Sequence, residues 1–180
     1  MNNIIPRSCV TECASLRADE LASRLEQGAR SLANFVRTIS DAQWHMPVPR
    51  DGRTVGVIVH HVASVYPLEV ELAQKLAAGE AITGVTASGI HSMNAIHAKE
   101  NSAVSREETL VLLAQNSGRA AAAIRALSDA DLGRAAPISL YGDAPLTCQF
   151  MLEDHAVRHS YHHLSIIAEA LQTAEMAVSR

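Results

Sequence analysis

The stretch DHAVRHSYHHLSIIAEAL, residues 154–171, holds four of the nine histidines in this chain of 180 residues. Successive residues of an α-helix are rotated by about 100°, so His155, His159 and His163 lie within about 40° of a common direction. Three apolar side chains share that direction: Leu152, Ile166 and Ala170. A mostly apolar helical face turns towards the interior of a fold. The pattern therefore predicts a helix that carries several imidazoles into a helical core.

A second histidine pair lies in TVGVIVHHVAS, residues 54–64. On a helix, His61 falls among apolar side chains, whereas His60 is rotated away from them by about 100°. The residues around the direction of His61 are Thr54, Val57, Val65, Leu68 and Leu72. We therefore expect His61 to point inwards and His60 to lie on a flank of its helix.

Buried imidazoles need partners, because a buried polar group without a hydrogen bond costs about 1–3 kcal/mol. Two histidines four residues apart on a helix can both reach one metal ion at about 2.0–2.1 Å, with a third supplied by another helix. Three neutral imidazoles leave a coordination position open for water or substrate, which is typical of catalytic zinc sites. The alternatives are core histidines bonded to carbonyls or carboxylates, or a metal-free interaction module in which His61 lies far from His159.

Two long helices are predicted in the first half of the chain. Residues 17–40 show apolar residues at intervals of three and four. The second helix begins after Thr54, which is suited to cap it, and stops at Gly79. Pro67 lies inside this helix and is expected to bend it.

Two more long helices are predicted in the second half. Ser105 and Glu108 have the spacing of a capping box, which would open a helix over residues 106–128. Thr147 is predicted to cap a last helix that ends near Met176. Four helices that each bury one stripe are most economically packed as an all-α four-helix bundle.

Long connections join these helices. Residues 41–53 and 80–90 are predicted loops, the first of which holds Trp44 against the bundle. Residues 91–104 are predicted to be a shorter helical or irregular segment, and 129–146 another long connection. We expect one domain over residues 1–180, with a loosely ordered N-terminal segment at 1–15.

The composition is 48% hydrophobic but only 3% aromatic, which favours helices over sheet. A formal net charge of −4 with scattered Lys and Arg gives no general attraction for nucleic acid or for anionic membrane surfaces. No apolar run reaches the roughly 20 residues of a membrane span, and the first residues lack the apolar segment of a signal peptide. Three cysteines do not indicate a disulfide framework, so a reducing, cytoplasmic location is expected.

The motifs TVGVIVHHVAS and RHSYHHLSII together resemble those of the DinB-like superfamily of metal-binding four-helix bundles. That superfamily includes bacillithiol transferases and the N-terminal domain of mycothiol-dependent maleylpyruvate isomerase. The resemblance spans nearly the whole chain in helix order and spacing. It implies a three-histidine metal site made of His61, His159 and His163. Many members continue the last motif with Gly and Gln, whereas this chain has Ser165 and Ile166 there.

The resemblance also implies a metal-dependent enzyme of thiol-transferase or isomerase type that acts on a small molecule. The ion would lower the pKa of a low-molecular-weight thiol cosubstrate, and hydrolysis by activated water is the nearest variant. Zinc is the favoured ion, with nickel, iron or manganese as alternatives. The competing function is a non-catalytic, metal-stabilised or metal-sensing dimeric bundle. A homodimer is expected, and no catalytic residue is assigned.

Several other polar residues have two interpretations each. His155 is either a fourth ligand or substrate contact, or a hydrogen-bonded histidine at the mouth of the site. Glu69, Glu153 and Asp154 either orient a ligand's second ring nitrogen or are surface carboxylates, which is the commoner case.

The remaining polar candidates lie in the middle of the chain and beside the last helix. His91 and His97 either line a pocket entrance or belong to a solvated helix. Cys148 is expected to be an isolated thiol, and a structural zinc site at Cys9 and Cys13 lacks a second cysteine pair.

Overall fold

Hydroxyl side chains cap the three long helical segments for which the sequence predicts a cap. Thr54 Oγ1 accepts a hydrogen bond from Val57 N at 3.3 Å, and Thr147 Oγ1 accepts one from Phe150 N at 3.1 Å. Ser105 Oγ likewise accepts from Glu108 N at 3.3 Å. The reciprocal contact of the Glu108 side chain is not made among the described residues, so only half of the predicted capping box forms.

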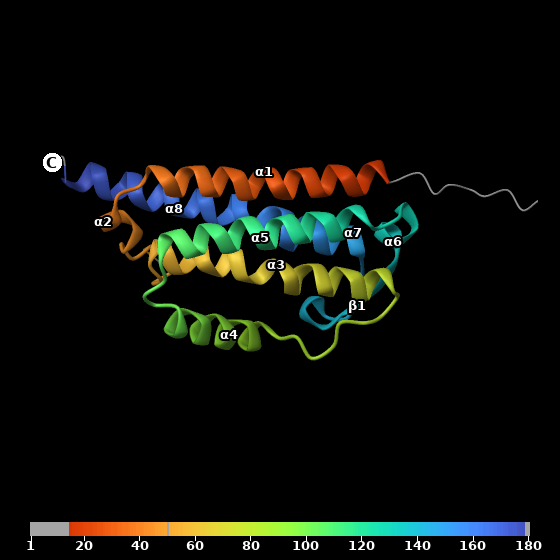
Figure 1. Ribbon diagram of the computed structural model, residues 1–180. Helices are drawn as coiled ribbons and strands as arrows, with labels where there is room; N and C mark the ends of the chain where they lie inside the picture. Colours follow the sequence, from red (N-terminus) through yellow and green to blue (C-terminus); the bar gives the residue numbers. More distant parts are fainter. Residues whose placement is uncertain (1–14, 50, 179–180) are drawn as a thin grey trace, which may run out of the picture.

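The computed structural model describes residues 15–49 and 51–178. Its four long helices form one bundle (Figure 1). They are α1 (Leu16–Thr38), α3 (Val55–Ala77), α5 (Arg106–Arg125) and α8 (Arg158–Val178). The predicted all-α four-helix bundle is therefore confirmed.

The order of the helices around the bundle differs from their order in the chain. α1 packs against α5 and α8. α3 packs against α5, against α8 and against the two short segments that precede α8 in the chain. Consecutive long helices α1 and α3 are thus diagonal to one another. In Figure 1, α1 and α8 run in one direction and α3 and α5 in the other, so two neighbouring pairs are parallel. Parallel neighbours need long connections, because the chain must return along the bundle before the second helix begins.

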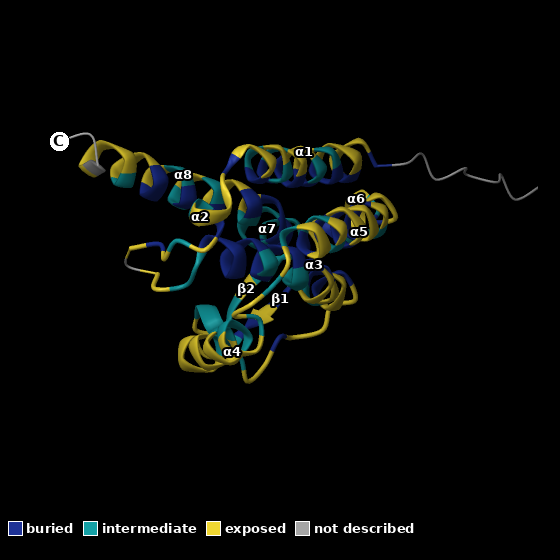
Figure 2. Ribbon diagram, turned by 60° about the vertical axis from the view of Figure 1, so that its left-hand side comes forward, coloured by how far each residue is buried: buried dark blue, intermediate teal, exposed yellow. Residues whose placement is uncertain are grey.

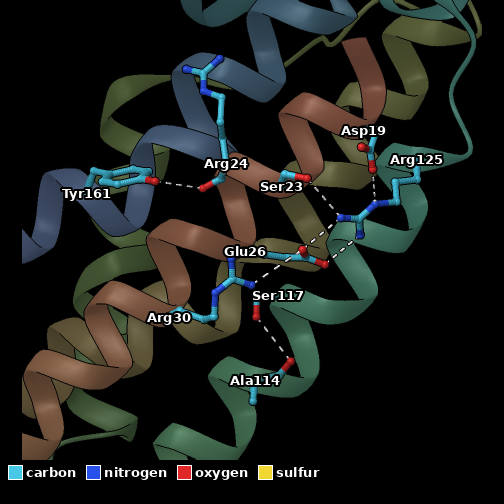
Figure 3. Close-up of polar contacts among 9 residues, drawn as sticks. All are labelled: Asp19, Ser23, Arg24, Glu26, Arg30, Ala114, Ser117, Arg125 and Tyr161. Carbon is cyan, nitrogen blue, oxygen red and sulfur yellow. Dashed lines mark hydrogen bonds and ion pairs between the residues drawn. The ribbon is translucent and has the colours of Figure 1, made fainter. Parts of the chain in front are cut away.

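Exposed ion pairs join α1 to α5 (Figure 3). The Arg125 guanidinium donates to Asp19 Oδ1 at 2.8 Å and to both carboxylate oxygens of Glu26, at 2.8 and 3.0 Å. On the other side of α1, Tyr161 Oη donates to the Arg24 carbonyl at 3.1 Å. Solvent screens such exposed pairs, so each is expected to contribute little to the stability of the fold.

Several connections contain short elements that the sequence pattern does not predict. The first connection forms α2 (Asp41–Trp44), which places Trp44 in the core with 3% of its surface exposed. α4 (Ala87–Glu100) begins within the predicted loop at 80–90. The predicted connection at 129–146 instead contains α6 (Asp129–Gly133), the short 3-10 helix η1 (Ser139–Tyr141) and a hairpin of β1 (Ala135–Ile138) and β2 (Ala144–Thr147). The strands pair antiparallel, with Ala136 opposite Leu146, and β1 also bridges to Ile82.

The predicted last helix is not one regular α-helix. It consists of α7 (Cys148–Met151), a π-helical segment η2 (Leu152–Val157) and α8. The i→i+5 hydrogen bonds of a π-helix put an extra residue into the turn, so residues before and after it are rotated relative to a regular helix. The angular prediction that grouped His155 with His159 and His163 assumed a regular helix, and His155 is not among the candidate ligand atoms that His159 and His163 bring close to His61.

The buried face of α3 is also rotated from the predicted stripe. Leu68, predicted to point inwards, is 40% exposed, whereas the neighbouring Glu69 is only 6% exposed. Figure 2 shows the dark blue inner faces of the long helices meeting at the core, with α4 outside them. α3 is long and apolar enough to match a membrane span, but 61% of its most apolar window is buried inside the bundle, so this is a weak indication. α3 continues as helix through Pro67.

The single-domain prediction over residues 1–180 includes residues 1–14, which lie outside the described residues, and it stays a prediction. The same holds for the predicted loose segment at 1–15, apart from its last residue. Ser15 is described, and its Oγ caps α1 by accepting from Ala18 N at 3.0 Å.

Candidate metal centre

Two neighbouring helices bring three predicted histidines together. His61 lies on α3, and His159 and His163 lie one turn apart on α8. His61 and His163 are buried, with 7% and 8% of their surface exposed, and His159 is partly buried. Their candidate ligand atoms all lie within 4.8 Å of one another. The metal-free interaction module required His61 and His159 to be far apart, and the structure does not have that arrangement.

The distances within the cluster suit one ion. His61 Nε2 and His159 Nε2 are 3.2 Å apart. Two ligands at about 2.1 Å from a tetrahedral ion are themselves about 3.4 Å apart. The ring centroids are 5.1 Å apart for His61 and His159, and 4.9 Å for His159 and His163. His163 Nδ1 is buried without a hydrogen-bond partner among the described residues. Three imidazole nitrogens at these distances fit a divalent metal ion such as zinc.

Glu69 holds the second ring nitrogen of one candidate ligand. His159 Nδ1 donates to Glu69 Oε1 in a short hydrogen bond. This contact fixes the tautomer of His159 in which Nε2 carries a free lone pair towards His61, as is usual behind metal-bound histidines. The interpretation of Glu69 as a surface carboxylate, which is the commoner case, is therefore wrong. Glu153 instead pairs with Arg24, and Asp154 with Arg158, at the edge of the fold.

The cluster favours neutral rings. Burial, followed by the charges of His159 and Arg53, lowers the pKa of His61 from its ordinary 6.5 to about 2. The same causes in the same order lower the pKa of His163 to about 3. Both rings are therefore unprotonated at neutral pH, which is the form that can bind a metal ion.

A second pair of histidines borders the cluster on the α4 side. His60 Nδ1 is 2.9 Å from His97 Nε2, and Ser64 Oγ is 3.3 Å from the same atom. The rings of His61 and His97 are 5.5 Å apart. His60 therefore lies on the flank of α3, as predicted. The ring of His97 lies close to the three-histidine cluster. His91 belongs to the exposed part of α4.

His155 lies outside the three-histidine cluster. Tyr141 Oη donates to Asp154 Oδ2 at 2.8 Å, so it accepts from His155 Nε2 at 3.0 Å. Burial lowers the pKa of His155 more strongly than the nearby carboxylates raise it. This arrangement matches the interpretation of His155 as a hydrogen-bonded histidine at the mouth of the site. Its Nε2 is engaged by Tyr141.

Arg53 contributes to the lowered pKa values of His61 and His163, and the sequence pattern did not single it out. It directly precedes the Thr54 cap, in a tight turn where Gly52 has φ +81° and Val48 N donates to the Arg53 carbonyl at 2.9 Å. Its guanidinium forms a two-point ion pair with Asp51, from Nε at 2.6 Å and from Nη2 at 2.8 Å. No helical periodicity applies to a turn, so neither residue carried a signal in the sequence.

Cys148 is buried at the start of α7. Burial, with a smaller effect of Asp131, raises the pKa of its thiol to about 11. It is therefore protonated at neutral pH and poorly suited to act as a nucleophile. Cys9 and Cys13 lie outside the described residues.

Comparison with solved structures gives similar bundles. YfiT from Bacillus subtilis, described as a probable metal-dependent hydrolase with an unusual four-helix bundle topology, is 21% identical with a TM-score of 0.71. The match covers 97% of this chain and 95% of YfiT. A protein from Exiguobacterium sibiricum assigned to the DinB family is 19% identical, with a TM-score of 0.56 over 89% of this chain and 93% of its own. At these identities the likeness shows the fold.

Comparison by sequence gives the family. A search of curated proteins found no significant match. The family model of the DinB superfamily matches residues 24–167, which include α3, the hairpin and the first half of α8. Because this match covers most of the chain and agrees with the fold, the chain belongs to the DinB superfamily.

Proposed function

We propose that this protein is a divalent-metal-dependent enzyme that acts on a small molecule, with His61, His159 and His163 as the metal ligands. The observation that carries the proposal is the convergence of three imidazoles from α3 and α8 within 4.8 Å, backed by Glu69. Zinc is the favoured ion, and nickel, iron or manganese also accept imidazole ligands.

The ligand set supports an open, catalytic type of site. Three protein ligands leave room for water or substrate, whereas structural zinc sites use four. A divalent ion bound there supplies Lewis acidity, which lowers the pKa of a bound water or thiol and polarises a substrate carbonyl. The protein's own contribution is to keep His61 and His163 neutral and to orient His159 through Glu69.

Hydrolysis is the reaction that we favour. The similar fold of YfiT, described as a probable metal-dependent hydrolase, supports it. Transfer or isomerisation with a low-molecular-weight thiol is the second candidate, supported by the resemblance to thiol-dependent members of the superfamily. Cys148 is poorly suited to be the nucleophile in either reaction, since its thiol is buried and protonated.

A non-catalytic metal-stabilised or metal-sensing bundle is the competing function. A closed apolar surround of the ion would favour it. The polar His60, Ser64 and His97 beside His61 favour the enzyme instead. The cytoplasmic location and the homodimer remain part of the proposal, and light scattering of the purified protein tests the latter.

Metal analysis of the purified protein tests the proposed site. We expect about one divalent ion per chain after reconstitution with zinc or nickel. The paired change His159→Ala and His163→Ala should abolish uptake while far-UV circular dichroism stays helical. His61 Nε2 and His159 Nε2, 3.2 Å apart, are also within hydrogen-bond distance of one another, and the absence of uptake after reconstitution would contradict the metal site.

A reaction screen tests the chemistry. The metal-loaded protein is assayed against small esters and amides, and against electrophiles with several cellular thiols. Turnover that disappears both with a chelator and in the paired histidine variant supports an enzyme. Full metal loading without turnover in either screen favours the non-catalytic bundle.

A further inference from the structure

α4 is a weakly packed helix beside the candidate metal centre. It runs alongside α3, outside the four long helices (Figure 1), and none of its residues is buried. The half-buried side chains of α4 share one face: Ile90, Asn94, His97 and Ala98. Met93 and Ile96, its other large apolar side chains, are 46% and 58% exposed. Because α4 buries so little apolar surface, its detachment from α3 requires far less free energy than unfolding of the bundle.

The segment that contains α4 is anchored at its two ends. Val85 N donates to Ser139 Oγ at 2.9 Å, and the same hydroxyl donates to the Val85 carbonyl at 2.9 Å. At the other end, the Val104 carbonyl accepts from Trp44 Nε1 at 3.3 Å. Between these anchors, among the described residues, only His97 makes side-chain hydrogen bonds to another element. α4 can therefore move away from α3 while both of its ends stay attached.

His97 joins α4 to α3 directly beside a candidate ligand. Its Nε2 lies 2.9 Å from His60 Nδ1 and 3.3 Å from Ser64 Oγ, and we call these two contacts the latch. The ring of His97 meets the ring of His61 nearly edge-on, with the centroids 5.5 Å apart. The rings of His61 and His163 are 5.6 Å apart, so His97 is as near to His61 as that candidate ligand is. α4 thus occupies one side of His61.

The latch leaves one polar atom unsatisfied. His97 Nδ1 is buried without a hydrogen-bond partner among the described residues. Such an atom lowers the stability of the position that buries it, and movement of α4 would expose it to water. His61 and His163 are only 7% and 8% exposed, so an ion or a substrate needs a way in to reach them. α4 is the weakly held element next to them.

We propose that α4 is a movable lid on the three-histidine centre, held closed by the latch, and that its opening admits the metal ion and the substrate. Val85 and Val104 mark the fixed ends of the moving segment. The inference rests on the proposed function for what the lid admits, whereas the movement of α4 can be measured without any metal. Lids of this kind control entry to many enzyme sites and exclude water from them when closed.

Hydrogen exchange of the metal-free protein tests the movement. A helix of 14 residues is only marginally stable by itself, so α4 should lose protection of its amides whenever it leaves α3. His97→Ala should speed exchange in α4 roughly fivefold or more, the effect of losing one or two hydrogen bonds, and leave α1, α3 and α5 unchanged. His91→Ala is the matched control, because His91 is an exposed histidine of the same helix. It should exchange like the parent protein.

The kinetics of zinc binding test what the lid admits. In His97→Ala, uptake of zinc and its release to a strong chelator should both speed up, while Kd stays nearly constant, because the latch is present in the metal-free and the metal-bound protein alike. Locking α4 to α3 should slow both rates. His60→Cys with His97→Cys, joined by a short bifunctional thiol reagent in a chain with Cys9→Ser and Cys13→Ser, provides the locked form, and the same protein without the reagent is its control.

Each outcome supports or overturns the lid. Equal exchange of α4 in His97→Ala and His91→Ala overturns it. Faster zinc release with unchanged uptake and a weaker Kd also overturns it, because His97 would then be a metal ligand. Unaltered rates in the locked form overturn it as well, and this measurement does not need His97→Ala to fold. Absence of zinc uptake by the parent protein overturns the proposed function, and hydrogen exchange then decides the latch independently.

Discussion

At the scale of single residues, Glu69 fixes the orientation of one of the three candidate ligand histidines. Its Oε1 accepts from His159 Nδ1, so the other nitrogen of that ring faces His61. Glu69 Oε2 is buried without a hydrogen-bond partner among the described residues. A buried carboxylate with one unsatisfied oxygen is costly, and a cation nearby would offset that cost.

Glu69→Gln should weaken metal affinity by about 10- to 100-fold, as is typical when the partner of a ligand histidine is changed. The amide keeps the shape but removes the negative charge that strengthens the imidazole as a ligand. Competition with a chromophoric chelator measures the affinity. Glu71→Gln on the same helix is the control, since Glu71 is exposed and pairs only with Lys75 among the described residues. Equal losses in the two variants would contradict a direct role of Glu69.

The metal-free protein should lose stability as the pH falls. The pKa values of His61 and His163 are lowered to about 2 and about 3 in the folded protein, from an ordinary 6.5. Below pH 6.5 the unfolded chain therefore binds protons that the folded chain does not, and the free energy of unfolding decreases until the pH reaches those lowered values. Above pH 6.5 the two rings contribute no pH dependence. Urea unfolding across this range measures it.

The control for this pH dependence is the paired variant His61→Asn and His163→Asn, which removes both titrating rings. It should show a flatter dependence between pH 3 and the ordinary histidine pKa of 6.5. A slope as steep as that of the parent protein would assign the effect to other groups.

At the scale of elements, the π-helical segment η2 and α4 shape what surrounds the ion. His155, on η2, contacts Tyr141 and is not part of the cluster that His159 and His163 form with His61. None of the residues of α4, all of which are described, is buried. α4 is held to α3 in part by the contacts of His97 with His60 and Ser64, so its position depends on polar contacts beside the site.

Close packing where α2 meets α3 gives a prediction for Gly56. A Cβ at Gly56 would lie 2.6–2.9 Å from three ring atoms of Trp44. Trp44 is buried, and its Nε1 donates to the Val104 carbonyl at 3.3 Å, so the ring cannot simply swing away. Overpacking costs about 1–3 kcal/mol, against a gain in helix propensity of about 1 kcal/mol. Gly56→Ala should therefore lower the free energy of unfolding.

Gly118→Ala is the matched control for this substitution. Gly118 is a helical glycine on α5, and a Cβ there would meet no atom of the described residues within 4 Å. This change should raise stability by up to about 1 kcal/mol. Chemical unfolding of both variants measures the difference, and stabilisation by Gly56→Ala would show that Trp44 packs more loosely than described.

At the scale of the whole molecule, the candidate metal ion would connect α3 to α8. These helices are neighbours in the bundle but come from distant parts of the chain. The core of the bundle is apolar and extends along all four long helices, so the fold does not depend on the ion for its formation. Metal binding is expected to stabilise a bundle that is already folded.

Loading with zinc should therefore raise the melting temperature, by an amount that grows with the logarithm of the zinc concentration relative to Kd. An ion that binds only the folded state adds about 2.7 kcal/mol when its concentration is 100 times Kd. Calorimetry with increasing zinc, followed by a chelator, measures the shift and its reversal. The variant with His159→Ala and His163→Ala should melt at the same temperature with and without zinc. A zinc-dependent shift in that variant would place the ion elsewhere.

The amino-acid sequence by itself determined where the four long helical segments lie, three of their caps and the inward direction of His61. Spacing and capping are local properties, so they can be read without knowing the neighbours of a segment. The resemblance to DinB-like motifs then indicated which histidines would meet, and the structure brings those three together.

Only the tertiary structure decided which polar groups surround those histidines. Glu69 is buried and Leu68 exposed because α3 is rotated in the bundle by its contacts with α5 and α8. His155 lies on η2, where its ring contacts Tyr141 and does not join the three candidate ligands. Arg53 acts on the cluster from a turn, where no periodic signal exists. Each of these positions depends on contacts between segments far apart in the chain, and local spacing carries no information about them.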